Sequence, residues 1–325
     1  MPAGEVMTSD RPLVSVVIPA YNACAFIDDA IASVLTQDYP NIEVIVVDDG
    51  SIDDTAARAV VHGPRVQCLH RQNSGGYPGA VRNTGIAHAQ GRYLAFLDAD
   101  DIMLAGRLSS QVTFLERHPG VGLVFSDYRN VEAAGPAASS HFEACISIAR
   151  AFAGRSSIVL DSPAATAHLA HENFGIPSTT MLRREVLATV PAFPTMLQTS
   201  EDFVFFYLVA RRFPIGAMAK IGALRRLHSG NTTADTLRVL RNHVASRAML
   251  RNTETSRHNV RLLTRFIGDA ERHLADLYAD QRRFRDAIAC GLRSLRHSGG
   301  DVTRGQQSLR TLARTVALAA GVKPR

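Results

Sequence analysis

The chain has 325 residues and a mass of 35.2 kDa, long enough to bury one large or two modest hydrophobic cores without disulfides. Hydrophobic residues make up 46% and charged residues 20%, a composition typical of globular proteins that excludes a disordered chain. The four Cys residues lie far apart without a CxxC pair, so they indicate neither a disulfide framework nor a zinc site and favour a reducing, cytoplasmic setting. No apolar run reaches 18 residues and residues 1–11 lack an apolar stretch, so we expect neither a membrane span nor a signal peptide.

The net charge of +6 is distributed unevenly along the chain. Residues 1–230 contain 18 Lys and Arg against 22 Asp and Glu, whereas residues 231–325 contain 18 against 8. An acidic front and a strongly basic back indicate two regions with different partners.

Residues 12–130 alternate between short β-branched runs and segments with helical spacing. Strands are predicted at 13–18, 42–47, 66–70, 92–97 and 121–125, with helices at 23–37, 53–62, 79–89 and 104–117. Nearly continuous apolar strands separated by helices indicate a mostly parallel sheet covered on both faces. Ligands bind such sheets at the carboxyl ends of the strands, which is where the polar side chains of this region cluster.

The rest of the chain divides into two parts. For residues 131–175 we expect an irregular excursion with one helix at 162–171. A strand at 177–182, a helical turn at 184–190, a helix at 200–213 and a Gly-interrupted strand at 214–227 follow. From about residue 233 the pattern is helical throughout and includes two antiparallel helices joined near 280–283, without a repeating 34-residue period.

The segment Asp98-Ala99-Asp100 closes the fourth predicted strand. Residues i and i+2 of a strand point the same way, so two carboxylates would face one crevice about 6–7 Å apart. Two like charges at that spacing favour a cation, and hard oxygen ligands favour Mg²⁺ or Mn²⁺. A bare D-x-D is more often a solvated acidic turn, but the position directly after a buried strand favours a functional site.

Other candidates have a structural alternative beside the functional one. Asp48, at the end of the second strand, suits a base N–H or a ribose hydroxyl, and capping of the following helix by Asp49 or Ser51 is compatible with that role. Glu201 and Asp202 open a helix, where the helix dipole alone stabilises acids, but one of them is the best candidate general base.

Two further sequence features are less specific. His228 follows the last strand; a lone His is more often a surface residue, and here it is also a candidate metal ligand or diphosphate contact. The glycine-rich segment 75–79 does not fit GxGxxG, and no GxxxxGK[ST] or GxSxG segment occurs.

Several motifs in this order resemble the family 2 glycosyltransferases of the GT-A fold. They are VSVVIPAYN at 14–22, VVDDGSIDDT at 46–55, NSGG at 73–76 with AVRNTGI at 80–86, GRYLAFLDADD at 91–101, SED at 200–202 and RLHSGNTT at 226–233. The resemblance covers roughly residues 12–233. The chain departs from the family pattern at Tyr77-Pro78-Gly79, where a small residue is usual, and at Val81, where Ala is frequent. No QxxRW-like segment follows Asp202, and this absence disfavours a processive synthase.

The resemblance implies an α/β protein with a GT-A (Rossmann-like) mixed, mostly parallel sheet flanked by helices, and a C-terminal helical region. The GT-A domain would span 1–232, with the nucleotide-sugar half at about 12–130 and the acceptor half at about 131–232, before a basic helical region at 233–325. It implies an inverting, metal-dependent enzyme that moves a sugar from a nucleotide-diphospho-sugar to a sugar or lipid-linked acceptor hydroxyl. Bacterial surface polysaccharide or glycoconjugate synthesis is the expected setting.

The resemblance also implies roles for individual residues. The nucleotide and donor would be bound by residues of the first four motifs: Pro19, Ala20, Tyr21, Asp48, Asn73, Arg82, Asp98, Ala99 and Asp100. Asp100 would hold Mn²⁺ or Mg²⁺ on the diphosphate, with Asp98 and His228 completing the site. Asp202 would be the catalytic base, with Glu201 as the second candidate.

Other interpretations stay open. The chain could be a catalytically silent nucleotide-sugar-binding or scaffold protein. A sugar-nucleotide pyrophosphorylase is disfavoured because residues 20–23 lack a Gly-rich basic loop. The basic C-terminal region could dock on anionic lipid at the inner face of the membrane, or form a lid or homodimer surface with solvated Arg. We expect no nucleic-acid partner, because no aromatic residues interleave the basic ones.

Overall fold

The computed structural model describes residues 11–132, 135–298 and 301–320. Residues 1–10, which make up most of the N-terminal segment for which we expect no signal peptide, lie outside the described residues. Residues 14–117 alternate strands and helices in the predicted order, apart from the short β5, which was not predicted. The elements are β1 (Val14–Ala20), α1 (Ile27–Leu35), β2 (Ile42–Asp48), α2 (Thr55–Val60), β3 (Val66–His70), α3 (Pro78–His88), β4 (Tyr93–Phe96), β5 (Ile102–Met103) and α4 (Arg107–Arg117).

The second part of the sheet domain is more regular than predicted. Its elements are β6 (Leu123–Glu132), β7 (Gly135–Pro136), α5 (His141–Ala144), α6 (Ile146–Phe152), β8 (Ser157–Leu160), α7 (Ser162–His171), β9 (Thr180–Arg183), α8 (Glu201–Ala210) and β10 (Ile215–Arg226), with 3₁₀ turns at Pro177–Thr179, Arg184–Ala188 and Thr232–Ala234. The helix at 162–171 is confirmed. The expectation of an otherwise irregular excursion is wrong, because α5, α6 and β8 are too short to show a clear hydrophobic period.

The strands form one sheet in the order β3-β2-β1-β4-β9-β6-β10-β5, with β7 and β8 pairing off this path. β3, β2, β1 and β4 are parallel to one another, and so are the long strands β6 and β10. The short β9 joins these two parallel groups by antiparallel pairing with β4 and β6. The predicted mixed, mostly parallel sheet flanked by helices is therefore confirmed.

Each face of the sheet carries its own hydrophobic core. Alternate residues of β1 divide between them: Val16 and Ile18 pack with α1 and α4, and Val17 packs on the opposite face. That second core also contains the aromatic residues of α8, including Phe205 and Phe206, which are fully buried. The helix that carries the Glu201-Asp202 pair is thus anchored in the core.

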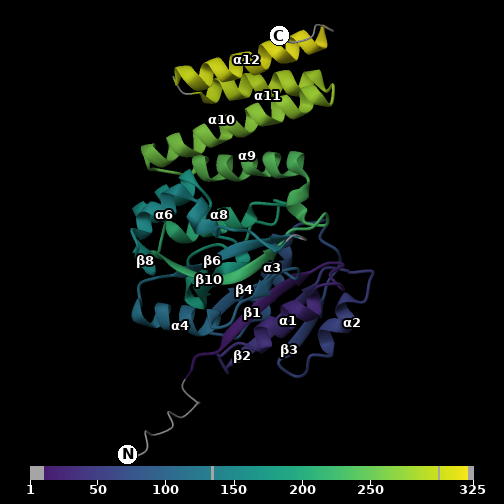
Figure 1. Cartoon of the computed structure of the whole chain (residues 1–325), viewed down its shortest axis with the longest axis vertical. Helices are drawn as coiled ribbons and strands as arrows, with labels where there is room; N and C mark the ends of the chain where they lie inside the picture. The colour runs from purple at the N-terminus through teal and green to yellow at the C-terminus, as the bar shows by residue number, and fades with distance from the viewer. Residues whose placement is uncertain (1–10, 133–134, 299–300, 321–325) are drawn as a thin grey trace, which may run out of the picture.

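The C-terminal region consists of α9 (Thr236–Asn252), α10 (Arg257–Asp280), α11 (Phe284–His297) and α12 (Val302–Ala319). Figure 1 shows these helices stacked one beyond another from the sheet domain outward. Leu250 of α9 and Leu263 of α10 belong to the same core as α8, so the first two helices pack on the sheet domain. The domain boundary at 232/233 stays a prediction. Within the described residues, none of the helices combines the length and the apolar character needed to cross a membrane.

Candidate active site

The parallel register of β1, β2 and β3 brings the predicted nucleotide-binding residues to one edge of the sheet. Ala20 pairs with Asp48, and Asp48 pairs with His70, so the three strands end together. Asp48 is 4% exposed; its carboxylate accepts a hydrogen bond from the Ser51 backbone N–H (3.3 Å) and lies 3.4 Å from Nδ1 of His70. Tyr21, directly after β1, is 52% exposed and leaves its ring available to a ligand.

Asp49 holds the next loop in place. Its carboxylate accepts hydrogen bonds from the backbone N–H (3.0 Å) and the hydroxyl (2.5 Å) of Ser74, and its carbonyl accepts one from the side-chain amide of Asn73 (2.9 Å). Gly50 has φ of +74°, a left-handed conformation that suits glycine at this turn. The interpretation of Asp49 as a helix cap is wrong, because its oxygens are used to position the loop that carries Asn73.

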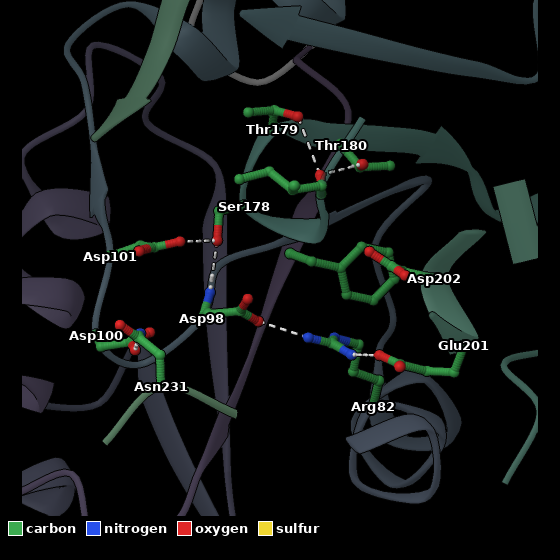
Figure 2. A network of polar contacts seen from close by, with 12 residues as sticks. Arg82, Asp98, Asp100, Asp101, Ser178, Thr179, Thr180, Glu201, Asp202 and Asn231 are labelled. Atoms are coloured by element: carbon green, nitrogen blue, oxygen red, sulfur yellow. Dashed lines mark hydrogen bonds and ion pairs between the residues drawn. The ribbon is translucent and has the colours of Figure 1, made fainter. Parts of the chain in front are cut away.

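Arg82 of α3 connects the two acidic segments of the site. One guanidinium nitrogen, Nη2, donates to Asp98 Oδ1 at 2.6 Å, and the other, Nη1, donates to Glu201 Oε1. Burial disfavours the charged guanidinium, but Asp98 and Glu201 outweigh burial and raise its pKa above the usual arginine value. Figure 2 shows Arg82 between Asp98 and Glu201, with Asp202 beside Glu201 on the same side of Arg82. The D-x-D segment and the later acid pair therefore share one site.

Hydrogen bonds through Ser178 fix the chain around the D-x-D segment. The backbone N–H of Asp98 donates to the Ser178 hydroxyl (3.0 Å), which donates to the Asp101 carboxylate (2.5 Å). Asp101 also accepts from the backbone N–H of Arg226 at 3.1 Å, so it ties the end of β10 to the end of β4. Burial, followed by the charges of Asp98 and Asp100, raises the Asp101 pKa well above its usual value.

Asp100 meets the segment that follows β10. Its Oδ2 lies 3.0 Å from Nε2 of His228 and accepts a hydrogen bond from Asn231 Nδ2 at 2.9 Å. The His228 ring is stacked on Phe26, with ring centroids 4.7 Å apart. Burial and the neighbouring Asp98 raise the pKa of Asp100, and a cation beside it would relieve both effects.

The two acids at the start of α8 have different environments. Glu201 is 3% exposed and uses one carboxylate oxygen to pair with Arg82, and burial raises its pKa to about 7. Asp202 is half-buried; it accepts one hydrogen bond, from the Phe203 backbone N–H (2.7 Å), and no other from the described part of the chain. Burial also raises the pKa of Asp202, a change that favours proton uptake. Unlike Glu201, Asp202 makes no ion pair among the described residues.

The donor set near Asp100 fits a divalent cation that is shared with a substrate. No group of three or more His, Cys, Asp or Glu side chains in the described residues could hold a metal ion by itself. Mg²⁺-type sites commonly use one or two carboxylates and complete their shell with substrate phosphates and water. The Asp100 carboxylate, with the His228 imidazole beside it, would supply enough protein ligands for such a site. The Asp98 carboxylate pairs with Arg82.

The family profile described as Glycosyl transferase family 2 matches residues 15–190, more than half of the chain. The chain belongs to glycosyltransferase family 2. The matched stretch contains all the expected donor-binding residues and ends before Glu201, Asp202 and His228. The roles of all these residues stay predictions.

Curated relatives extend the similarity over parts of the chain. WfgD of Escherichia coli, named as UDP-Glc:alpha-D-GlcNAc-diphosphoundecaprenol beta-1,3-glucosyltransferase, is 38% identical over 120 residues (37% of this chain, 47% of WfgD). TuaG of Bacillus subtilis, named as a putative teichuronic acid biosynthesis glycosyltransferase, is 41% identical over 113 residues (34% and 44%). An uncharacterized glycosyltransferase of Rickettsia bellii is 31% identical over 226 residues (68% and 29%). The matched stretches span less than half the length of each of these relatives.

Two solved structures, of TarS and of a mannosyltransferase, share the fold along almost the whole chain. Residues 1–349 of S. aureus TarS, in complex with UDP-GlcNAc, superpose with a TM-score of 0.65 at 18% identity, covering 96% of this chain and 93% of that one. The mannosyltransferase PcManGT from Pyrobaculum calidifontis, in complex with GDP-Man and Mn²⁺, gives a TM-score of 0.57 at 20% identity (96% and 82%). At these identities the likeness shows the fold.

Some residues of the site carry no functional assignment from the sequence. Ser178 lies in a segment without a recognisable motif, and its contact with Asp101 spans 77 residues. Asn231 and Asp101 fall inside two of the quoted motifs, and their chemistry could have been considered from the sequence. Arg247 of α9, described below, gives no sequence signal because it is one of many arginines in a basic region.

Proposed function

We propose that the chain transfers a sugar from a nucleotide-diphospho-sugar to an acceptor hydroxyl, with inversion at the anomeric carbon, in the synthesis of a bacterial surface polysaccharide or glycoconjugate. The observation that carries the proposal is the pair of ion contacts that Arg82 makes to Asp98 and Glu201, because they join a donor-type acidic segment to a candidate base in one site. The activities named for WfgD and TuaG and the UDP-GlcNAc bound by TarS support this choice of substrate class.

Donor binding is assigned to the strand edge. Asp48 would accept hydrogen bonds from the base or ribose, and the exposed ring of Tyr21, with Pro19 and Ala20, would border the nucleoside. Asn73 lies on the loop that Asp49 positions at the same edge.

A divalent ion at the diphosphate fits the residues next to it. Asp100 and His228 would hold Mn²⁺ or Mg²⁺ with Asp98 nearby, and the bound ion would offset the negative charge that develops on the leaving group. The backbone turns at Ala99, between Asp98 and Asp100, and the Asp101 N–H donates to the Asp98 carbonyl across this turn at 3.0 Å.

The transfer step uses Asp202 as general base. The acceptor oxygen forms a bond to the anomeric carbon while the bond from that carbon to the diphosphate oxygen breaks. The nucleoside diphosphate leaves with the electron pair, and Asp202 takes the proton of the acceptor hydroxyl. A positioned base of this kind adds about 10²–10⁴-fold to the rate. Glu201 is the weaker candidate because Arg82 already engages its carboxylate.

The first experiment pairs donor binding with turnover. UDP-GlcNAc, UDP-Glc and GDP-Man are tested with Mn²⁺ by thermal shift, and release of nucleoside diphosphate is then measured with GlcNAc-diphosphoundecaprenol and free sugars as acceptors. We expect Asp202→Asn to abolish release while donor affinity stays within a few-fold. Asp286→Asn, an exposed carboxylate of α11 paired with Arg283, is the matched control and should behave as the wild type.

The same assays separate the alternatives. Donor binding by the wild type without transfer to any acceptor would favour a silent binding or scaffold protein. Formation of nucleoside triphosphate from a donor and pyrophosphate would favour a pyrophosphorylase. Full turnover by Asp202→Asn would remove Asp202 from the base role.

We also propose a cytoplasmic protein that contacts the inner face of the membrane through its C-terminal helices. Three arginines at four-residue spacing on α10, Arg257, Arg261 and Arg265, form an exposed arginine row without an ion pair among the described residues. Like charges at this spacing repel, and an anionic lipid surface would relieve the repulsion. The alternative is a dimer surface or a solvated row.

A further inference from the structure

Helix α9 holds both ends of the helix that carries Asp202. Before α8 begins, the backbone N–H of Gln198 donates to Asn242 Oδ1 of α9 at 3.1 Å. At the end of α8, the Tyr207 hydroxyl and the Arg211 guanidinium (3.3 Å) both contact the carboxylate of Glu254, just after α9. The first C-terminal helix is therefore connected to the catalytic helix at both ends.

Between these two contacts, Arg247 of α9 packs against the residue that follows Asp202. Its guanidinium carbon lies 3.9 Å from the ring centroid of Phe203 and 4.0 Å from that of Phe266 on α10, and the residue is 4% exposed. Its Nη1 donates to the Ser246 hydroxyl at 3.1 Å. A cation buried between two aromatic faces is favourable only where the rings and a nearby negative charge replace lost water.

That negative charge belongs to Asp202. Burial lowers the pKa of Arg247 to about 9, which Asp202 opposes, so Arg247 remains a cation at neutral pH. Burial raises the pKa of Asp202, and two cations oppose it: Arg82 from α3 and Arg247 from α9. The other charged groups facing Asp202 are the acids Asp98, at the end of β4, and Glu201 on its own helix.

We infer that Arg247 is a positioning residue for the reaction: it packs on Phe203, the residue next to Asp202, and so brings a buried positive charge to the start of α8, which makes the C-terminal helices part of the catalytic apparatus. The inference rests on the proposed role of Asp202 as base. It assigns α9 a task distinct from docking, because Arg247 is buried against Phe203 of α8, whereas the arginine row of α10 is exposed.

The test compares Arg247→Met, which removes the charge, with Arg247→Lys, which keeps it. The readouts are kcat and the donor KM between pH 5 and 9. For Arg247→Met we expect the acid limb of kcat to move up by about one pH unit or more, the size of shift that an opposite charge near a carboxylate commonly produces, with the donor KM within threefold of wild type. Arg247→Lys should keep the wild-type limb and lose thermal stability, because an ammonium group stacks less well on two rings.

Three outcomes decide the matter. An unmoved acid limb in Arg247→Met would show a purely structural role and overturn the inference. If Arg247→Met does not fold, Arg247→Lys provides the test. A shift of the acid limb of kcat in Arg247→Lys, which keeps the positive charge, would also overturn the inference. Full turnover by Asp202→Asn would instead refute the proposed role of Asp202 as the base, whatever Arg247 does, so the two failures are distinguishable.

Discussion

Replacing Arg82 by Met tests the contact on which the site depends. The change keeps much of the apolar length of the side chain and removes the charge that neutralises Asp98 and Glu201. Glu201 is 3% exposed, so its carboxylate cannot regain water after Arg82 is lost. We expect Arg82→Met to unfold more easily than the wild type and to lose transfer activity.

The magnitude follows from burial and from the pKa of Glu201. Removing one partner of a buried ion pair costs about 3–5 kcal/mol, against a total stability of about 5–15 kcal/mol for a typical domain. With Arg82 present the pKa of Glu201 is about 7, above the ordinary 4.5, and without Arg82 it must rise further. When the pKa of a group is higher in the folded state, the free energy of unfolding falls as the pH rises from the unfolded-state pKa to the folded-state pKa. Wild type and variant therefore lose the same amount of stability between pH 4.5 and 7. Above pH 7 only the variant continues to lose stability, by about 1.36 kcal/mol per pH unit.

Urea unfolding followed by circular dichroism at pH 6, 7, 8 and 9 measures this effect. The stability gap between wild type and Arg82→Met should be constant below pH 7 and widen above it. In the Glu201→Gln background most of the widening should disappear, because Glu201 no longer titrates and only the weaker effect of Arg82 on Asp202 remains. A gap that does not change with pH, or one that widens as much in the double variant as in Arg82→Met, would refute the assigned coupling.

Two shorter predictions concern packing and the surface. Gly85→Ala would bring a new Cβ against the Cγ1 methyl of Val17 under α3 and should lower the unfolding free energy by about 1–3 kcal/mol, while Gly120→Ala, which meets no atom within 4 Å, should change it little; equal urea midpoints for the two variants would contradict the packing. Replacing the whole arginine row by Gln in the full-length protein should weaken binding to phosphatidylglycerol vesicles, measured by flotation, by about 1 kcal/mol per residue at low salt. Unchanged flotation would refute membrane contact through this face.

The nucleotide half could be predicted from the sequence because its signals are local. Strands such as β1 and β2 are continuous apolar runs, and parallel pairing brings their carboxyl ends together without further information. Asp48 and the D-x-D segment could therefore be placed at one edge before any coordinates were known. The same reasoning failed at residues 141–152, although Ser140 and Glu143 form a capping box that the sequence pattern S-x-x-E announces.

The connections across the site could not be predicted, because nothing local encodes them. Arg82 and Glu201 are 119 positions apart, and each has an ordinary local explanation, in a helix and at a helix N-terminus. The family resemblance indicated that both belong to the site but not that they touch. Only the packing of α3 beside α8 on one sheet face decides it.

The basic C-terminal region shows why a count of charges overstates what a surface can bind. Several of its arginines are occupied within the helical stack: Arg304 pairs with Asp269, Arg293 with Glu271, and Arg314 with acids of α10. These pairs connect neighbouring helices and leave less free charge for a partner. The remaining cations include the exposed arginine row, which suits an anionic surface, and the buried Arg247, which packs on Phe203 next to Asp202. Membrane contact and support of the catalytic base are thus separable tasks of one helical region, and each can be removed without the other.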